Sequence, residues 1–236
     1  MEIPKKRILL KLTGELFVDT NQSLTASLVN HVIDQMKQLE TLYQFALVIG
    51  GGNFFRDRTH GKMLGIKSSI GHQIGMMATI MNGLILKDLL EQKNISATIL
   101  CAMPAPEIGE PISQQAISDN LNEGHTLIFT GGTGNPFFTT DTNAVLRSLQ
   151  IDADFIYKGT KVNGVFTADP MTNPSAKKLP TVTYREALAQ KLAVMDPTAF
   201  VLAEQHNKII RVFNIFEKDG LLKTVHDASF GSIITP

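Results

Sequence analysis

The sequence has little cysteine, no excess charge and no long apolar run, and each shortage excludes a class of protein. Among its 236 residues Cys101 is the single cysteine, which excludes an intrachain disulfide and favours a reducing compartment. Because Cys101 stands in an apolar run, we expect it in the core. The 22 basic and 22 acidic side chains cancel, which argues against a general nucleic-acid-binding surface.

Patterns for membrane spans and leader peptides are missing as well. No apolar stretch approaches the ~18 residues that a transmembrane helix needs. The N-terminus, M-E-I-P-K-K-R-I-L-L-K-L, has no long apolar region and no cleavage-site pattern. The sequence therefore predicts a soluble, cytoplasmic protein with no membrane partner.

Several familiar catalytic motifs are also absent. There is no G-x-x-x-x-G-K-[ST], which excludes a Walker-type NTPase, and no strand leads into G-x-G-x-x-G, which argues against a dinucleotide dehydrogenase. H-E-x-x-H and C-x-x-C do not occur and the six histidines are scattered, so no protein metal site is predicted. No serine-centred nucleophile elbow is found.

What the sequence does contain is an alternation of short apolar runs with longer segments of helical periodicity. Strands are predicted at Arg7–Leu12, Phe45–Gly50, Ile95–Cys101, Thr126–Phe129, Asp154–Thr160, Ile209–Asn214 and Ser232–Thr235. Helices are predicted at Thr25–Thr41, Ser69–Lys93, Pro111–Asn122, Asn143–Leu149, Tyr184–Gln190 and Pro197–His206. This order predicts an α/β protein with a mainly parallel sheet and helices on both faces. A lobe boundary is expected near residue 150, and an exposed loop at Asp169–Pro180.

The predicted helix from Ser69 to Lys93 is rich in methionine and small residues. It is either an ordinary buried helix or part of a dimer interface. Met76, Met77 and Met81 would line the interface, because methionine side chains pack adaptably.

Three glycine-containing loops follow predicted strands. They read K-L-T-G-E (residues 11–15), V-I-G-G-G-N-F-F-R (48–56) and T-G-G-T-G-N-P-F-F-T-T-D (130–141). In the third, glycines let the backbone approach a ligand, and the helix start offers free N–H groups to a phosphate. Each loop alone could be a simple turn. Because ligands bind at the carboxyl ends of strands in open α/β sheets, the three together predict one phosphate-binding crevice.

A fourth segment, K-G-T-K-V-N-G-V-F-T-A-D-P, spans residues 158–170. It is either a basic hairpin or part of a nucleotide pocket. In the second interpretation a lysine lies near the phosphates and Phe166 lies against the base.

With these segments in place, the chain resembles the bacterial uridylate (UMP) kinases of the amino acid kinase superfamily along nearly its whole length. The motifs that carry the resemblance stand in the family's order: V-I-G-G-G-N-x-F-R, G-M-x-A-T-x-x-N-G-L, G-T-G-N-P-F-F-T-T-D, K-x-T-K-V-x-G-V-F-T-A-D-P and V-M-D-x-x-A-F. The resemblance implies a single three-layer α/β/α sandwich, with a UMP-side lobe at about 1–150 and an ATP-side lobe at about 151–236. It also implies a homohexamer built from dimers, with GTP and UTP as possible effectors.

The resemblance further implies which residues hold each substrate. On the ATP side these are Lys11, Leu12, Thr13, Gly14, Gly52, Arg56, Thr160, Phe166 and Asp169. On the UMP side they are Gly51, His72, Thr133, Gly134, Asn135, Pro136, Phe137, Phe138, Thr139 and Thr140. The implied catalytic residues are Lys11, Asp141 and Lys161.

The chemistry that this implies needs no general base. The acceptor would be a phosphate oxygen of UMP, largely ionised at neutral pH because its second pKa is ~6. Catalysis is then positioning and charge neutralisation, with Mg²⁺ arriving on ATP. Lys11 and a second lysine would neutralise the transferred group, and Asp141 would hold their ammonium groups. We favour Lys161 as the second lysine, with Lys158 as the alternative.

Three positions depart from the family's pattern. Thr13 replaces a serine and keeps its hydroxyl, and Asn163 replaces an aspartate in a turn. The third, His72, stands where the family has a UMP-binding aspartate, and a neutral imidazole accepts only one hydrogen bond. His72 is therefore either a ligand contact or a helix-start residue. Two rival functions follow: a related kinase with another acceptor, and a nucleotide-binding regulator without catalysis.

Overall fold

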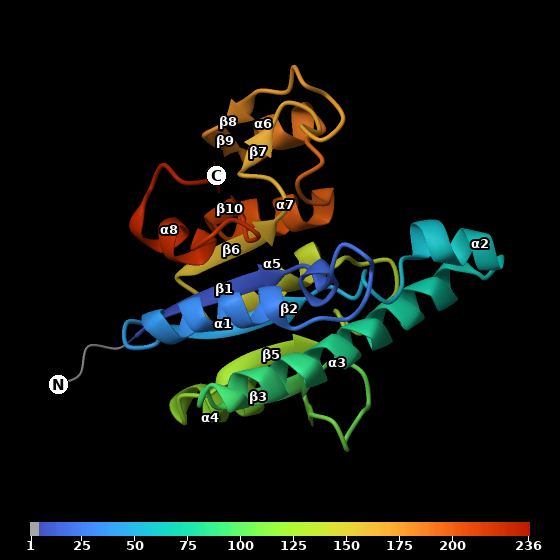
Figure 1. Cartoon of the computed structure of the whole chain (residues 1–236), viewed down its shortest axis with the longest axis vertical. Coiled ribbons are helices and arrows are strands. Elements are labelled where there is room, and N and C mark those ends of the chain that lie inside the picture. The colour runs from blue at the N-terminus through green and yellow to red at the C-terminus, as the bar shows by residue number, and fades with distance from the viewer. Residues whose placement is uncertain (1–4) are drawn as a thin grey trace.

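Within residues 5–236, nine strands form the central sheet, in the order β4-β3-β5-β2-β1-β6-β10-β11-β9 (Figure 1). The structure is a computed structural model that describes residues 5–236; residues 1–4, part of the N-terminal segment for which no leader peptide is predicted, lie outside the described residues. The strands are β1 Lys6–Leu12, β2 Tyr43–Ile49, β3 Ala97–Cys101, β4 Glu110–Pro111, β5 Thr126–Thr130, β6 Phe155–Thr160, β9 Thr181–Thr183, β10 Ile210–Asn214 and β11 Ser232–Thr235. Among the described strands of this sheet only the pairing of β10 with β11 is antiparallel, so the predicted mainly parallel sheet is confirmed.

Helices cover both faces of this sheet. They are α1 Ser27–Leu39, α2 Lys62–Leu64, α3 Ser68–Gln92, α4 Gln114–Asn122, α5 Thr140–Gln150, α6 Tyr184–Ala189, α7 Pro197–Gln205 and α8 Gly220–His226. Alternation along β1 separates two cores, since Ile8 and Leu10 pack with α1, α3 and α8, whereas Leu9 packs with α4, α5, α6 and α7. The result is the predicted three-layer α/β/α arrangement.

Some elements differ from the sequence-based prediction. The helix predicted from Pro111 begins at Gln114, because Pro111 belongs to β4 and the Ser113 side chain caps the helix by accepting from Ala116 N at 3.0 Å. The predicted loop at Asp169–Pro180 ends in a short strand, β8 (Lys178–Leu179), which pairs with β7 (Val165–Phe166). The sequence analysis did not predict β7, β8, β9, α8 or the π-helical turn η2 (Asp57–Gly61) with the adjoining α2.

The sheet runs without interruption past residue 150. Strand β1 pairs on one side with β2 and on the other with β6. A division into two lobes near residue 150 therefore stays a prediction.

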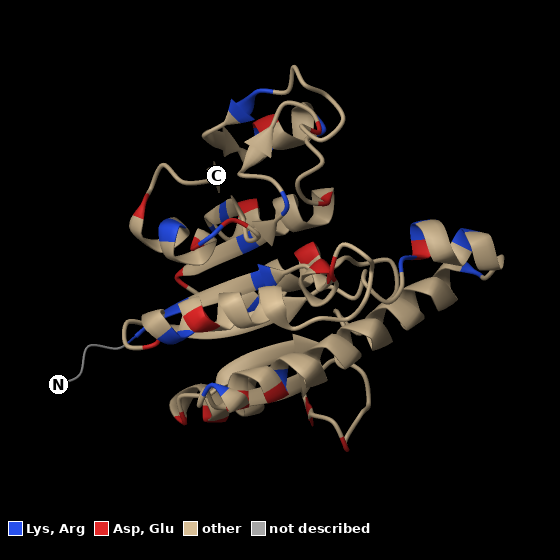
Figure 2. Ribbon diagram, in the orientation of Figure 1, with Lys and Arg blue, Asp and Glu red and all other residues tan. Residues whose placement is uncertain are grey.

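Helix α3 is the longest helix, and its first half extends with α2 beyond the body of the molecule (Figure 1). Met76 is 9% exposed, so its predicted place beside Met77 and Met81 on one surface is wrong: successive helical residues point about 100° apart. Met77 and Met81 are 56% and 48% exposed, and with Ile70 and Leu84 they form the exposed α3 stripe. Figure 2 shows that most of α3 carries no charged residue. Among residues 5–236 no helix is long and apolar enough to cross a membrane.

The single cysteine lies in the core, as predicted. Cys101 ends β3 and is 3% exposed. A Cβ atom built on Gly131 would lie 3.3 Å from its Sγ, so the cysteine lies directly behind the glycine loop that follows β5.

Candidate active site

The loops predicted to meet do lie together, because β5, β2, β1 and β6 are neighbours and all run parallel. Their carboxyl ends form one edge of the sheet. The contact between the first two loops is close enough to require glycine, since a Cβ on Gly14 would lie 2.6 Å from the carbonyl oxygen of Gly50. The order of the strands therefore brings the loops together at this edge and forms the predicted crevice.

The third loop has an unusual backbone. Gly131, Gly132 and Gly134 have φ angles of 72°, 59° and 79°, the left-handed region that favours glycine. Phe137 has φ 72° without being glycine, and its ring is 68% exposed. A strained, exposed aromatic residue in a loop is typical of a ligand-contacting segment.

Helix α5 begins where this loop ends. Thr139 accepts hydrogen bonds from Asp141 N at 3.1 Å and Thr142 N at 3.2 Å and so caps the helix. The helix thus starts at Thr140, at the end of the third loop where the sequence predicted a helix start, and the helical spacing of Asn143–Leu149 continues it. Its N-terminus lies at the crevice and favours an anionic ligand.

Side chains of helix α3 form hydrogen bonds with the backbone of two of the loops. Thr79 Oγ1 accepts from Gly131 N at 2.9 Å and donates to Met76 O at 2.7 Å. Asn82 Nδ2 donates to Gly50 O at 2.7 Å and to Asn53 Oδ1 at 2.8 Å. These supporting residues were not predicted as site residues, although the motif G-M-x-A-T-x-x-N-G-L contains Thr79 and Asn82. Polar residues on a buried helix face were the signal that could have identified them.

A buried charge cluster, the inner cluster, lies at the centre of the crevice. Asp141 Oδ1 is 3.0 Å from Lys11 Nζ, and Asp141 Oδ2 accepts from Lys158 Nζ at 2.6 Å. Lys158 also donates to the carbonyl oxygen of Val194. The three side chains are only 9–15% exposed. The register of the sheet brings them together, because Lys11 and Lys158 are partners in the β1–β6 pairing.

Burial and charge act on the pKa values of this cluster in opposite directions. Burial by itself would raise the pKa of Asp141, but the attraction of Lys11 and Lys158 outweighs it and lowers that pKa to about 2. Burial lowers the pKa of Lys158 to about 8, against the opposing effect of Asp141. Asp141 is therefore a fixed anion, and Lys158 is an ammonium group that burial has made easier to deprotonate.

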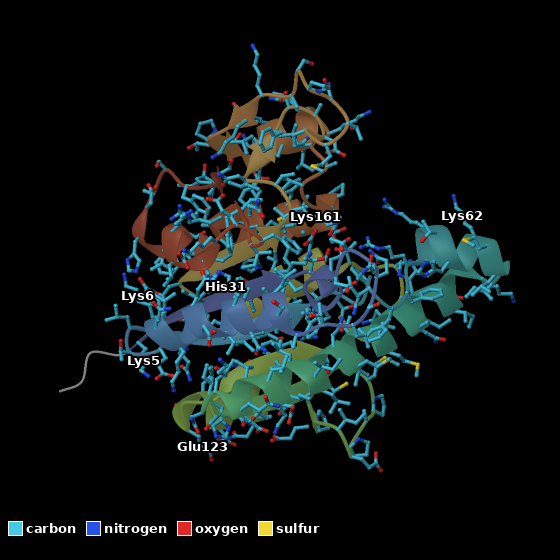
Figure 3. The ribbon with its side chains drawn as sticks, in the orientation of Figure 1. Lys5, Lys6, His31, Lys62, Glu123 and Lys161 are labelled. Atoms are coloured by element: carbon cyan, nitrogen blue, oxygen red, sulfur yellow. The ribbon has the colours of Figure 1, made fainter. Side chains whose placement is uncertain are left out.

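Lys161, the lysine favoured from the sequence, is not part of the inner cluster. It is 59% exposed and pairs with Glu15. Lys161, labelled in Figure 3, directly follows the end of β6. Arg56 Nη2 also donates to Glu15, at 2.5 Å. Glu15, Arg56 and Lys161 form the outer cluster. The geometry places Lys158, the alternative lysine, against Asp141.

Beside both clusters is a cleft of about 500 Å³. Most residues predicted for the ATP side line it: Lys11, Thr13, Arg56, Thr160, Phe166 and Asp169. Leu12 is instead a core residue, and Gly52 lines a neighbouring cavity. Gly14 packs against Asn53 and Gly50.

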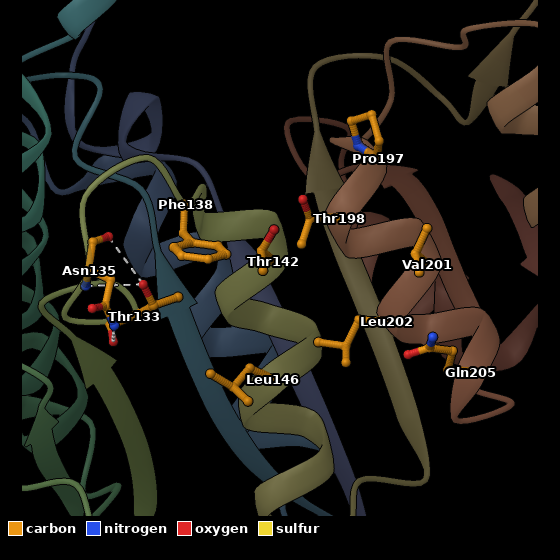
Figure 4. A pocket seen from close by; sticks show the side chains of 10 residues that line it. All are labelled: Thr133, Asn135, Phe138, Thr142, Leu146, Pro197, Thr198, Val201, Leu202 and Gln205. Atoms are coloured by element: carbon orange, nitrogen blue, oxygen red, sulfur yellow. Dashed lines mark hydrogen bonds between the residues drawn. The ribbon is translucent and has the colours of Figure 1, made fainter. Parts of the chain in front are cut away.

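Residues predicted for the UMP side lie on the third loop and on α3. His72 is in the first two turns of α3, and its ring centroid is 5.1 Å from that of Phe137. Gly51 packs on α3, since a Cβ there would be 2.8 Å from Gly75 O. Thr133, Asn135 and Phe138 face an apolar groove of about 570 Å³ between α5 and α7 (Figure 4). Pro136 is half-buried and precedes the exposed Phe137 in the loop.

Asp196 connects the C-terminal part of the chain to the third loop. Its carboxylate accepts from Thr139 Oγ1 at 2.5 Å and from Thr142 Oγ1 at 2.9 Å, and it caps α7 by accepting from Ala199 N. The sequence motif V-M-D-x-x-A-F contained Asp196, but only the fold places it near the loop.

The carboxylates of the cleft are poor candidates for metal ligands. Among residues 5–236 no group of three or more His, Cys, Asp or Glu side chains could hold a metal ion. Asp141 and Glu15 are each occupied by two cations. A divalent ion would fit here on nucleotide phosphates and water, with few protein ligands.

Known proteins share both the sequence and the architecture. The sequence profile described as "Amino acid kinase family" matches residues 6–214. The chain is 41% identical to the uridylate kinase of Pseudomonas fluorescens over 231 residues, 97% of this chain and 93% of that protein. The UMP kinase of Ureaplasma parvum superposes with a TM-score of 0.93 at 30% identity, covering 99% of this chain and 100% of that one. The UMP kinase of Bacillus anthracis gives 0.90 at 32% identity, covering 99% and 97%.

Proposed function

The chain belongs to the amino acid kinase family, and we propose that it transfers the γ-phosphoryl group of ATP to UMP, giving UDP and ADP. The observation that carries the proposal is the inner cluster, Lys11–Asp141–Lys158, at the junction of a nucleotide-sized cleft and a glycine loop. Two ammonium groups held by one carboxylate are what a reaction between two polyanions requires.

Each substrate has a place in this proposal. ATP occupies the 500 Å³ cleft, with Phe166 and Asp169 at its nucleoside and Lys11 and Thr13 at its phosphates. UMP lies along the third loop, where the N-terminus of α5 faces its phosphate. The two phosphate groups then meet at the inner cluster.

The protein's chemical contribution is charge neutralisation and alignment. The ammonium groups of Lys11 and Lys158 donate to the phosphoryl oxygens as negative charge moves from the acceptor to the leaving group. The two ammonium groups would repel each other, and Asp141 keeps them together. Because the acceptor phosphate is already ionised, no side chain has to remove a proton. Mg²⁺ carried by ATP would supply further neutralisation of the phosphates.

The exposed α3 stripe supports self-association of the chain. Ile70, Met77, Met81 and Leu84 are large apolar side chains on an uncharged run of helix, and such surfaces mark interaction sites. We propose dimers through this stripe, assembled into the homohexamer that the family resemblance implies, with GTP and UTP as effectors. Light scattering measures the oligomeric mass of Met77→Lys and Met81→Lys variants, which should be lower than that of the wild type if the stripe forms the dimer. A role in pyrimidine nucleotide biosynthesis would place the protein in the cytoplasm.

One experiment tests the function. Purified protein is given Mg-ATP with UMP, CMP, dUMP, AMP or N-acetylglutamate, and ADP formation is measured. The proposal requires a strong response to UMP alone, lost in a folded Lys11→Ala variant.

A preference for another acceptor would overturn the UMP assignment. It would direct attention to His72 and Phe137, whose contact is the one observation that favours a changed acceptor site. Nucleotide binding without ADP formation would instead favour a regulator.

A further inference from the structure

Three residues form the boundary between two cavities. Glu15, Arg56 and Lys161 line the 500 Å³ cleft and also a neighbouring cavity of about 610 Å³. They come from three different loops, after β1, β2 and β6. The outer cluster therefore joins three separate segments of the chain at the boundary between the two cavities.

Glu15 is the member that connects the other two. Its Oε1 accepts from Arg56 Nη2 at 2.5 Å, and its Oε2 pairs with Lys161 Nζ. Glu15 is 22% exposed, whereas Arg56 and Lys161 are 49% and 59% exposed. Its backbone is fixed at the start of the short helix η1 (Gly14–Phe17), where Glu15 N donates to Thr13 Oγ1. A restrained carboxylate thus holds two long, solvent-exposed cations.

Both cations keep hydrogen-bond donors for a ligand. A guanidinium group has five N–H donors, and Arg56 uses Nη2 for Glu15 and Nε for the Gly52 carbonyl at 3.1 Å. Within residues 5–236, its Nη1 has no hydrogen-bond partner. A lysine has three donors, and Lys161 directs one at Glu15. Glu15 can therefore stay bound to both cations while they contact phosphate oxygens.

We propose that Glu15 is a positioning residue for phosphoryl transfer, which fixes Arg56 and Lys161 at the separation at which both reach the phosphates of ATP. The inference rests on the proposed function of the cleft. Without the carboxylate, the two cations on separate loops repel each other and lose their preorganised positions. The opposite role, a carboxylate that competes with phosphate for the two cations, predicts the opposite change in ATP affinity.

The substitution Glu15→Gln tests whether the carboxylate strengthens or weakens ATP binding. The amide keeps the size of the side chain and removes its charge. We expect the KM for ATP to rise about tenfold, the Kd for ATP without acceptor to rise in parallel, and kcat and Tm to change little. An unchanged or lower KM for ATP would overturn the proposal.

Further variants separate positioning from general damage. Glu15→Asp keeps the charge but is one methylene too short to hold both cations, so its KM for ATP should lie between wild type and Glu15→Gln. In a Lys161→Met background, Glu15→Gln should cost much less than in wild type; full additivity would contradict the proposal. Glu204→Gln is the matched control, because it breaks an Arg–Glu pair of 3.0 Å outside both cavities and should leave KM unchanged.

The activity of the wild-type protein with UMP is measured before that of the variants. Wild-type protein that forms no UDP from UMP would contradict the proposed function. If the wild-type protein is active and the Glu15→Gln variant has the same kinetic constants, only the positioning role of Glu15 is contradicted.

Discussion

The inner and outer clusters have the same composition, one carboxylate between two cations, but different surroundings. The side chains of Lys11, Asp141 and Lys158 are 9–15% exposed. Arg56 and Lys161 are 49% and 59% exposed, with Glu15 between them. Charge pairs at 4 Å are worth roughly 1 kcal/mol in water and roughly 4 kcal/mol at the effective dielectric near a protein. The same charge pattern can therefore act on transition-state energy in one place and on ligand capture in the other.

The largest expected difference concerns the two lysines. Lys158→Met should lower kcat by about 100-fold or more, because a buried donor to the transferred group is lost. Lys161→Met should raise the KM for ATP several-fold and leave kcat within about threefold. Steady-state kinetics of both variants checks this. Equal losses of kcat would remove the distinction between the clusters.

Folding stability should separate the two carboxylates. Asp141→Asn leaves two ammonium groups without their buried partner and should cost about 3 kcal/mol, whereas Glu15→Gln should cost less than about 1 kcal/mol. Urea unfolding at pH 7 measures both. The pKa of Asp141 is lowered to about 2 in the fold, so its contribution is present above pH ~4 and lost as pH falls through about 2. The asparagine variant should lack that acid dependence.

The pH dependence of activity should report the inner cluster. Because burial lowers the pKa of Lys158 to about 8, its ammonium form is present below that pH and is lost above it. The value of kcat/KM, which follows the free enzyme, should fall about tenfold per unit above pH ~8. Lys158→Met should have a lower, flat profile in this range. A descending limb that persists in this variant would assign the titration to another group.

Salt should give the smallest effect, confined to the outer cluster. Raising KCl from ~0.05 M to ~0.5 M screens exposed charges far more than buried ones. The KM difference between wild type and Glu15→Gln should shrink by about threefold, while the kcat difference between wild type and Lys158→Met should persist. Parallel salt responses would mean that the two clusters do not differ in solvation.

Sequence alone predicts those features that depend on local pattern. The apolar run of β1, the helical spacing in α1 and α3, and glycine after three strands were sufficient for the layers and the crevice. Short strands such as β7 and β8 are held by their partners and leave little periodicity of their own. Helix α8 begins at Gly220 after the left-handed Asp219 and lacks a side-chain cap, so it had no start signal.

The choice between Lys158 and Lys161 is one that the local sequence pattern cannot make. Both lysines lie in one basic segment, and nothing in their spacing separates them. Which of the two lies against Asp141 depends on the register of β6 against β1, strands more than a hundred residues apart, which makes Lys158 the partner of Lys11. Glu15 was likewise present in K-L-T-G-E, but its two cations come from other loops.

Cys101 has a practical consequence because it is the only thiol in the chain and lies behind Gly131. A thiol-specific reagent can reach its buried Sγ only when the structure around the end of β3 opens. The modification rate of unaltered protein therefore measures how often this edge opens, without an introduced label. A nucleotide seated on the loop should slow that labelling.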